Sequence, residues 1–119
     1  GGNAEGVAEH AVGMMLALLK RMPEAHAAMR AGRAGDRNAL MGRELRGRTV
    51  GLVGIGHVGA RTAEILRLAF SCRVLACDPY LDAATVAARS VMTSASVLAL
   101  MFDGLDATTV GTHRGRRAP

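Results

Sequence analysis

The sequence predicts an α/β fold: the opening strand–helix–strand unit of a doubly wound parallel sheet, preceded by an N-terminal helix. Two short segments, residues 49–53 (TVGLV) and 73–77 (RVLAC), are as apolar as strands buried on both faces of a parallel sheet. Between them, apolar residues recur with helical spacing from Val58 to about Leu68. A strand, a helix and a second strand in this order predict a right-handed crossover.

The remaining segments predict further helices. From Val7 to about Arg30 apolar residues recur at three- and four-residue steps, and Asn3 is placed to cap this helix. Pro23 leaves two interpretations, one continuous helix or a break at Met22. Residues 31–48 read as a loop, and residues 83–89 as a short helix. The residues expected to share one side of the first helix, as packed core, are Val7, Ala11, Met14, Met15, Leu18, Leu19 and Met22.

Composition limits the class of protein. With 119 residues the chain forms at most one small domain, and a hydrophobic content of 50% argues against disorder. The net charge of +5 raises the question of a nucleic-acid partner, but aromatic residues make up only 3% and no DNA- or RNA-binding motif is present. We therefore expect solvated surface charge and no nucleic-acid partner. No apolar run is long enough to cross a membrane, so we expect no membrane partner either.

The two cysteines carry no recognisable site. The spacing of Cys72 and Cys77 fits neither a zinc site nor a CxxC redox pair, so no metal is predicted. A single pair of cysteines is also no disulfide framework. Reduced thiols are the ordinary state in the cytosol, which predicts a cytoplasmic protein.

The chemistry of the sequence is concentrated in Gly54-Ile-Gly-His-Val-Gly59, which follows the first predicted strand and opens the next helix. This GxGxxG pattern in this context is typical of a dinucleotide-binding Rossmann unit. Gly54 permits the tight turn, Gly56 lets a pyrophosphate approach the backbone, and Gly59 lets the helix lie against the strand. The free N–H groups at the helix start favour phosphate.

Asp78 closes the second predicted strand, nineteen positions after Gly59. Its carboxylate is placed to accept hydrogen bonds from the adenosine ribose and to repel a 2′-phosphate, which favours NAD over NADP. The competing interpretation is a glycine-rich turn with an aspartate that merely ends a strand; a methyltransferase loop is disfavoured by Gly59. For the His57 side chain, a solvent-facing loop position is favoured over contact with the cofactor. The predicted cofactor-binding residues are Gly54, Gly56, His57, Val58, Gly59, Asp78 and Pro79.

Three segments resemble the NAD-binding domain of the D-isomer-specific 2-hydroxyacid dehydrogenases, the family that includes phosphoglycerate dehydrogenase: NAEGVAEH at residues 3–10, ELRGRTVGLVGIGHVG at 44–59 and CDPY at 77–80. The resemblance covers about residues 1–90. It implies NAD as cofactor, hydride transfer at the CH–OH group of a D-2-hydroxy acid in the intact enzyme, and a homodimer formed through the N-terminal helix.

The chain departs from the family pattern in its catalytic residues and, from about Val91, in its tail. The family's catalytic arginine, acid and histidine cannot be placed, so no catalytic residue is assigned and we expect the chain to be inactive alone. The alternative is a non-catalytic dinucleotide-binding or dimerising remnant. We divide the chain into a partial NAD-binding domain at 1–90 and a tail at 91–119. The tail reads either as a frame-shifted sequence, which we favour, or as divergent sequence with a strand at 97–102.

An incomplete sheet has a further consequence for the apolar side chains of both predicted strands. Later strands and helices would normally pack against them, so we expect them to leave apolar surface uncovered. These residues are Val50, Leu52, Val53, Val74 and Leu75.

Overall fold

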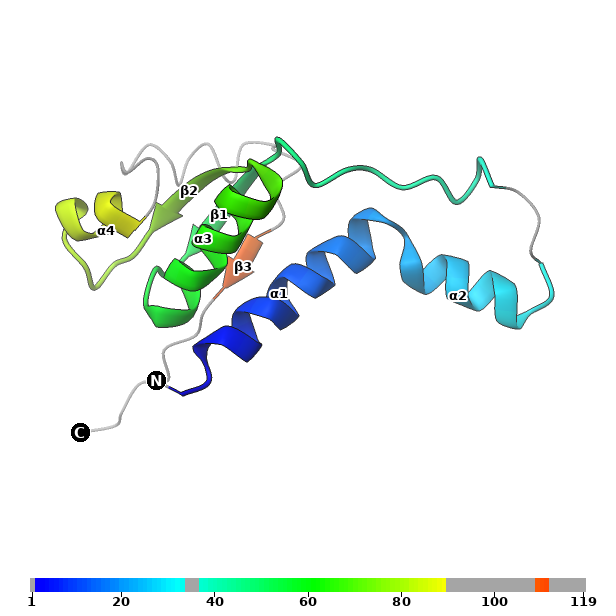
Figure 1. Ribbon diagram of the computed structural model, residues 1–119, viewed down its shortest axis with the longest axis horizontal. Coiled ribbons are helices and arrows are strands. Elements are labelled where there is room, and N and C mark those ends of the chain that lie inside the picture. Colours follow the sequence, from blue (N-terminus) through cyan, green and yellow to red (C-terminus); the bar gives the residue numbers. More distant parts are fainter. Residues whose placement is uncertain (1, 34–36, 90–108, 112–119) are drawn as a thin grey trace.

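The fold is α/β, as predicted, in a computed structural model that describes residues 2–33, 37–89 and 109–111 (Figure 1). Both predicted strands have the expected bounds, and the predicted strand at 97–102 lies outside the described residues. The elements in chain order are α1 (Ala4–Leu19), α2 (Met22–Arg30), β1 (Thr49–Val53), α3 (His57–Phe70), β2 (Arg73–Cys77), α4 (Ala83–Arg89) and β3 (Thr109–Gly111).

The three strands form one parallel sheet in the order β2-β1-β3. Val50 pairs with Val74 across β1 and β2, and Gly51 pairs with Thr109 across β1 and β3. Strand β3 was not predicted from the sequence. Along the chain, β2 is added on one side of β1 and β3 on the other side, so the strand order reverses at β1. The carboxyl end of β1 is therefore a topological switch point, where open α/β sheets bind their ligands.

The core lies between the sheet and the helices that cover it. Leu52 of β1, Val74 of β2 and Leu66 of α3 are completely buried. The expectation that both strands leave apolar surface uncovered is wrong, because Val50, Leu52, Val74 and Leu75 are at most 4% exposed. Val53 is half-buried. The strands are buried to this extent because α3 and other segments pack against them, and an expectation based on the number of strands alone does not include this cover.

The N-terminal segment is two helices, and the break falls slightly earlier than Met22. Helix α1 ends at Leu19 and α2 begins at Met22 with Pro23 in its first turn. Arg21, between them, adopts a left-handed conformation with φ of 54°. Asn3 occupies the N-cap of α1, but its side chain makes no capping hydrogen bond. The proline therefore marks the start of the second helix, where its missing N–H costs nothing.

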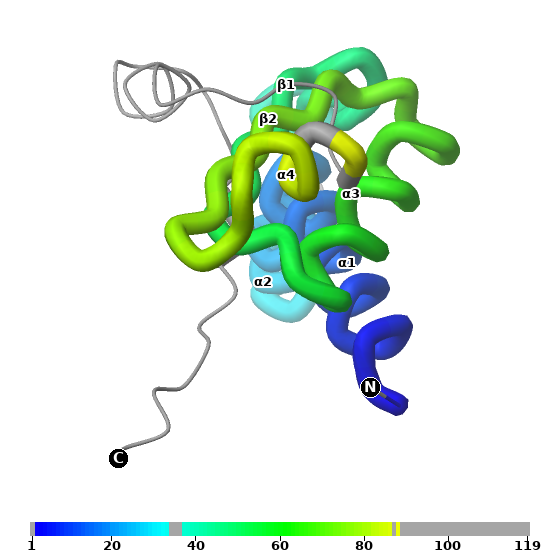
Figure 2. The backbone as a smooth tube through the Cα atoms, turned by 90° about the vertical axis from the view of Figure 1, so that its left-hand side faces the viewer, coloured from blue at the N-terminus to red at the C-terminus, as the bar shows by residue number. Residues whose placement is uncertain are grey.

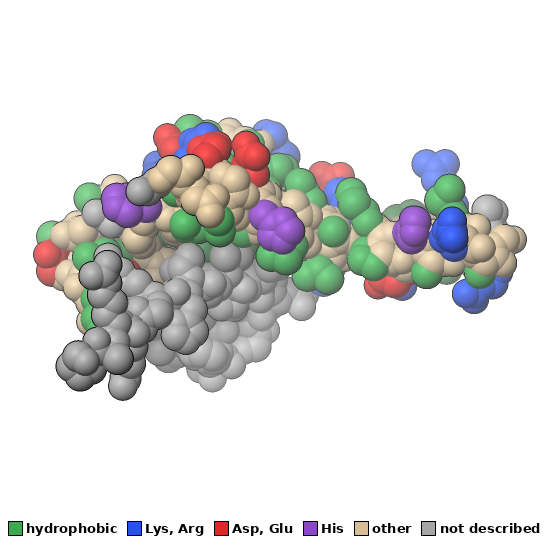
Figure 3. All heavy atoms as spheres, turned by 90° about the horizontal axis from the view of Figure 1, so that it is seen from below, with side chains coloured by type: hydrophobic (Ala, Val, Ile, Leu, Met, Phe, Trp, Pro, Cys, Tyr) green, Lys and Arg blue, Asp and Glu red, His purple; other side chains and the backbone are tan. Residues whose placement is uncertain are grey.

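The apolar side predicted for α1 is divided between core and solvent. Ala8, Ala11, Val12 and Met15 are buried, and α1 packs along α3 (Figures 1 and 2). Val7, Met14 and Leu18 were predicted to share this packed side, but they are exposed. A helix that rests on one neighbouring helix buries a narrow stripe, so the adjacent apolar positions stay outside. Hydrophobic side chains are accordingly visible on the surface of the elongated part of the molecule (Figure 3).

Candidate functional site

The turn between β1 and α3 has the shape that the glycine pattern predicts. Gly54 adopts φ of 90°, a region that L side chains rarely adopt. Its N–H donates a hydrogen bond of 2.7 Å to the Cys77 carbonyl, which continues the pairing of β1 with β2 by one residue. A Cβ on Gly59 would lie 2.4 Å from the Gly54 carbonyl oxygen, so α3 can start this close to the turn only with glycine there.

Helix α3 presents its free amide groups at this turn. Gly56 is the N-cap, no side chain caps the helix, and its first turn contains no acidic residue. The Ala60 N–H bonds the Gly56 carbonyl, so the amides of His57, Val58 and Gly59 lack partners within the helix. Among the described residues, no atom would lie within 4 Å of a Cβ on Gly56. The turn thus leaves open space beside an amide cluster that favours anions.

Asp78 connects the end of β2 to the glycine turn. One carboxylate oxygen accepts a 3.0 Å hydrogen bond from the Ile55 N–H, and the other accepts a 2.9 Å bond from the Tyr80 N–H. The Asp78 residue is half-buried, whereas the Ile55 side chain is fully buried. The predicted ribose-binding carboxylate and the predicted phosphate-binding loop are therefore in direct contact.

The other predicted residues fall around this contact. His57 is exposed, as expected, but it is the first residue of α3 and lies outside the loop. Val58 is half-buried, and its carbonyl accepts a 2.8 Å hydrogen bond from the Thr62 hydroxyl. Pro79 is exposed beside Asp78.

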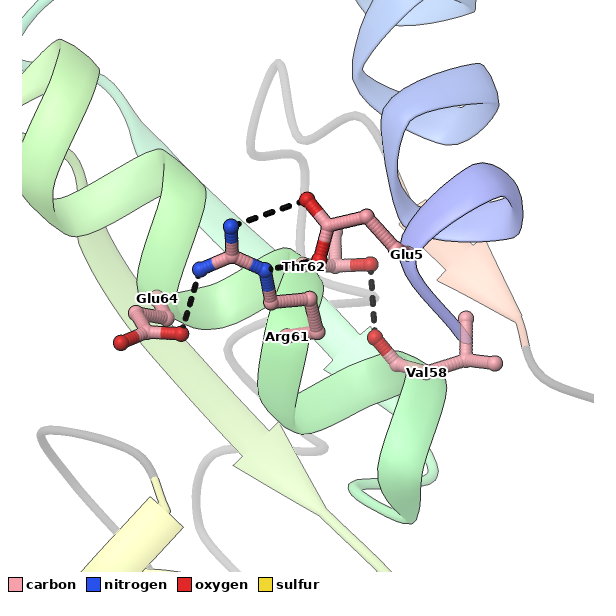
Figure 4. A network of polar contacts seen from close by, with 5 residues as sticks. All are labelled: Glu5, Val58, Arg61, Thr62 and Glu64. Atoms are coloured by element: carbon pink, nitrogen blue, oxygen red, sulfur yellow. Dashed lines mark hydrogen bonds and ion pairs between the residues drawn. The ribbon is translucent and has the colours of Figure 1, made fainter. Parts of the chain in front are cut away.

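Two features of this region were missed by the sequence analysis. Arg61 of α3 forms a bidentate ion pair with Glu5 of α1 and a second ion pair with Glu64 (Figure 4). The hydrogen bond from Arg61 is the main reason that the pKa of Glu5 is lowered. Nothing in the sequence signals a pair separated by 56 positions. The buried Thr62 hydroxyl was predictable, because threonine in a helix commonly bonds the carbonyl four residues earlier.

Both cysteines are free thiols, and Cys77, the last residue of β2, is the one beside the site. Burial, and to a smaller degree the Asp78 charge, raises the pKa of Cys77, which keeps it protonated at neutral pH. Burial likewise raises the pKa of Cys72, whose Sγ lies 3.3 Å from the Leu45 carbonyl oxygen. Among the described residues, no group of three His, Cys, Asp or Glu side chains could hold a metal ion. No helix in the same part of the chain is long and apolar enough to cross a bilayer.

The residues present fit a dinucleotide. Open space at Gly56 beside the first amides of α3 suits a pyrophosphate, and the Asp78 carboxylate at the end of the neighbouring strand suits ribose hydroxyls. Both groups lie at the switch point of the sheet.

Comparison with known families agrees with this geometry. The family described as D-isomer specific 2-hydroxyacid dehydrogenase, NAD binding domain, matches residues 12–109. The chain belongs to this family. The match runs past residue 90, where the resemblance of the individual motifs ends, and reaches the first residue of β3.

Curated relatives include a D-3-phosphoglycerate dehydrogenase of Archaeoglobus fulgidus, 41% identical over 82 residues, and a hydroxypyruvate reductase of Thermotoga maritima, 39% identical over 79 residues. These alignments cover 69% and 66% of the chain but only 15% and 25% of the respective relatives. The chain thus spans a quarter or less of the length of these enzymes.

Solved structures show the same arrangement. The pyruvate reductase of Chlamydomonas reinhardtii superimposes with a TM-score of 0.61 at 36% identity, over 73% of this chain and 25% of that structure. A D-lactate dehydrogenase of Aquifex aeolicus, solved with NAD and lactic acid, gives a TM-score of 0.61 at 26% identity over 92% of this chain and 27% of that structure. The NAD predicted from the glycine pattern is the cofactor of this family.

Proposed function

We propose that the β1–α3 turn and Asp78 form the adenosine and pyrophosphate half of an NAD site. In this proposal the amides at the start of α3 hold the pyrophosphate, Gly56 provides the space for it, and Asp78 accepts the ribose hydroxyls. Val58 and His57 contribute backbone N–H groups, and Pro79 shapes the loop beyond Asp78.

One observation carries this proposal. The glycine turn leaves free amides and open space on one side, and on the other it touches the one carboxylate that closes β2. A glycine-rich turn with a purely structural role has no need for open space at Gly56. It also has no need for an uncapped helix start with no acidic residue in its first turn.

The same carboxylate supports NAD over NADP. A negative charge at the ribose edge repels a 2′-phosphate, and residues 79–82 supply no arginine or lysine to bind one. The net positive charge of the chain does not change this preference for NAD over NADP, because it comes from another segment. Residues 20–48 hold eight Lys or Arg and three Asp or Glu, so this segment alone accounts for the net charge of +5.

For the whole protein we propose an oxidoreductase acting on the CH–OH group of D-2-hydroxy acids. Bound NAD would accept the hydride, and the residues of this chain would hold its adenosine end. Since the family's catalytic arginine, acid and histidine cannot be assigned, we expect the chain alone not to reduce NAD. NAD-dependent turnover of D-lactate, D-glycerate or D-3-phosphoglycerate by the purified chain, absent from the Gly56→Trp variant, would contradict this expectation.

A second candidate is a non-catalytic dinucleotide-binding or dimerising module. It is favoured by the exposed stripe of Val7, Met14 and Leu18 beside the buried stripe of α1. We propose that this stripe forms a homodimer contact. Sedimentation analysis should show dimers for the wild-type chain and a shift to monomers for Leu18→Glu; an unchanged mass would rule out this contact.

The remaining partners and the location are proposed from the cysteines and the composition of the chain. We propose a cytoplasmic location, because both cysteines are free thiols. We propose no membrane partner and no nucleic-acid partner, since aromatic residues for base stacking make up only 3% of the chain. Retention of the chain by duplex DNA or anionic vesicles at physiological salt would overturn the respective proposal.

The decisive test of NAD binding is a thermal melt with and without the cofactor. NAD should raise the melting temperature in a concentration-dependent way, because a ligand that binds only the folded chain stabilises it. Gly56→Trp should abolish the shift, since its side chain fills the open space beside the amides. Gly13→Trp, at another glycine with no atom within 4 Å of its Cβ position, is the matched control and should keep the shift. An NAD-independent melting temperature in the wild type would refute the proposal.

A further inference from the structure

We infer that Asp78 is a positioning residue for the glycine turn itself, holding the phosphate-binding backbone in shape before any cofactor arrives. This role is separate from ribose recognition. Only its expected effect on NAD binding rests on the proposed function, because the hydrogen bond itself joins two residues of this chain.

The β1–β2 ladder ends at the glycine turn. Val53 pairs with Cys77, and the Gly54 N–H still bonds the Cys77 carbonyl. The chain then turns away at Gly54, whose φ of 90° takes the next amide out of the regular ladder. At this point the Asp78 side chain replaces the backbone as acceptor and binds the Ile55 N–H at 3.0 Å. The carboxylate thus extends the ladder by one amide into the turn.

Both ends of this hydrogen bond are themselves fixed. The Ile55 side chain is fully buried and belongs to the hydrophobic core, so the donor has little freedom. The Tyr80 N–H holds the second carboxylate oxygen at 2.9 Å, which orients the acceptor. Hydrogen bonds to a charged acceptor are stronger than those between neutral groups. A part-buried bond across 23 positions, anchored at both partners, restrains the turn between β1 and α3.

The restrained segment leads directly into the amides proposed to bind pyrophosphate. Ile55 precedes Gly56, the N-cap of α3, and the free amides follow at residues 57–59. A turn that is already ordered pays less conformational entropy when it binds a ligand. Replacement of Asp78 should therefore weaken NAD binding in two ways, by loss of the ribose contact and by loosening of the turn.

The test measures amide hydrogen exchange by NMR in the NAD-free chain. In Asp78→Ala the Ile55 amide should exchange at least about tenfold faster than in the wild type, because its acceptor is removed. The Gly54 amide is an internal reference, since it bonds the Cys77 backbone and should stay slow. Asp82→Ala is the matched control: Asp82 accepts a 2.7 Å bond from the Thr85 N–H, so only exchange at that end of α4 should rise.

A second variant covers the case in which Asp78→Ala loosens the whole fold. Asp78→Asn keeps the shape and one acceptor oxygen, and the Ile55 amide should then exchange at a rate between those of the wild type and Asp78→Ala. An Ile55 amide that exchanges as slowly in both variants as in the wild type overturns the inference. NAD titration of the same samples is read separately. A wild type that fails to bind NAD but shows the predicted exchange pattern contradicts the proposed function and leaves the positioning role intact.

Discussion

Helices α2 and α3 differ in how they are held by the rest of the molecule. Helix α3 buries Gly59, Thr62, Ala63 and Leu66, lies against β1 and β2, and carries the free amides of the site. Helix α2 has no buried residue and lies at the end of α1 that is remote from the sheet (Figure 1). It lies within the segment at 20–48 that carries the net positive charge. Basic side chains are visible at that end of the molecule (Figure 3).

The difference shows that helical periodicity alone does not identify a packed helix. Isolated helices as short as α2 are marginal in water, because most helical stability in proteins comes from packing of an apolar face. Met22 and Met29 of α2 are more than half exposed. Helix α3 has partners on the sheet and on α1, and this fixes the geometry of its first turn. The proposed cofactor site is therefore built on the well-packed part of the described chain.

The largest effect expected from this comparison comes from truncating one side chain in each region. Leu66→Ala in α3 should lower the free energy of unfolding by about 2–5 kcal/mol, because it leaves a cavity in the core. Met29→Ala in α2 should change it by less than about 0.5 kcal/mol, since the side chain is 71% exposed. Urea denaturation measures both. Equal losses would show that α2 packs in solution, for instance in a dimer.

A smaller effect is expected from adding one methyl group to a glycine in each of two helices. Gly59→Ala places a Cβ 2.4 Å from the Gly54 carbonyl oxygen and should cost about 1–3 kcal/mol of stability, together with NAD binding. Gly13→Ala in α1 meets nothing within 4 Å and should stabilise the chain by about 0.5–1 kcal/mol. Thermal melts of the two variants should move in opposite directions. A stable Gly59→Ala variant that binds NAD normally would show that α3 can shift away from the turn.

The fold was largely predictable because its central strand–helix–strand unit is formed by residues that follow one another along the chain. The bounds of β1 and β2 follow from two apolar runs. The turn follows from two glycines, because the backbone angle at Gly54 and the close contact at Gly59 both require a residue without a side chain. The position of the candidate site was predictable for the same reason, since Asp78 directly follows the strand that neighbours β1.

What escaped prediction depends on contacts between distant segments. The division of α1 into buried and exposed stripes depends on where α3 lies, and the Asp78 bond to Ile55 depends on how the turn leaves the ladder. Strand β3 has only three residues, too few to show a period of two against its surroundings. Whether the tail at 91–119 is frame-shifted stays a prediction, against which the family match through residue 109 must be weighed.

The smallest expected effect concerns the link between α1 and α3. The pKa of Glu5 lies below its ordinary 4.5 in the folded chain, mainly through the hydrogen bond from Arg61. A lowered folded pKa contributes stability above pH 4.5 that is lost as the pH falls through the lowered value. Arg61→Ala should therefore be slightly less stable than the wild type at pH 7, and this difference should shrink as the pH falls below 4.5 and through the lowered pKa of Glu5. Because both residues are exposed, high salt should reduce it as well. A difference that grows on acidification would contradict this assignment.

The central claim, that the glycine turn and Asp78 select NAD, is tested most directly by calorimetric titration of the chain with NAD and with NADP. We predict saturable binding of one NAD per chain and weaker binding of NADP, with the preference eroded in Asp78→Ala. A control titration of Asp82→Ala should match the wild type, since that carboxylate lies beyond the site and accepts the Thr85 N–H. Equal or tighter binding of NADP by the unmutated chain would contradict the claim.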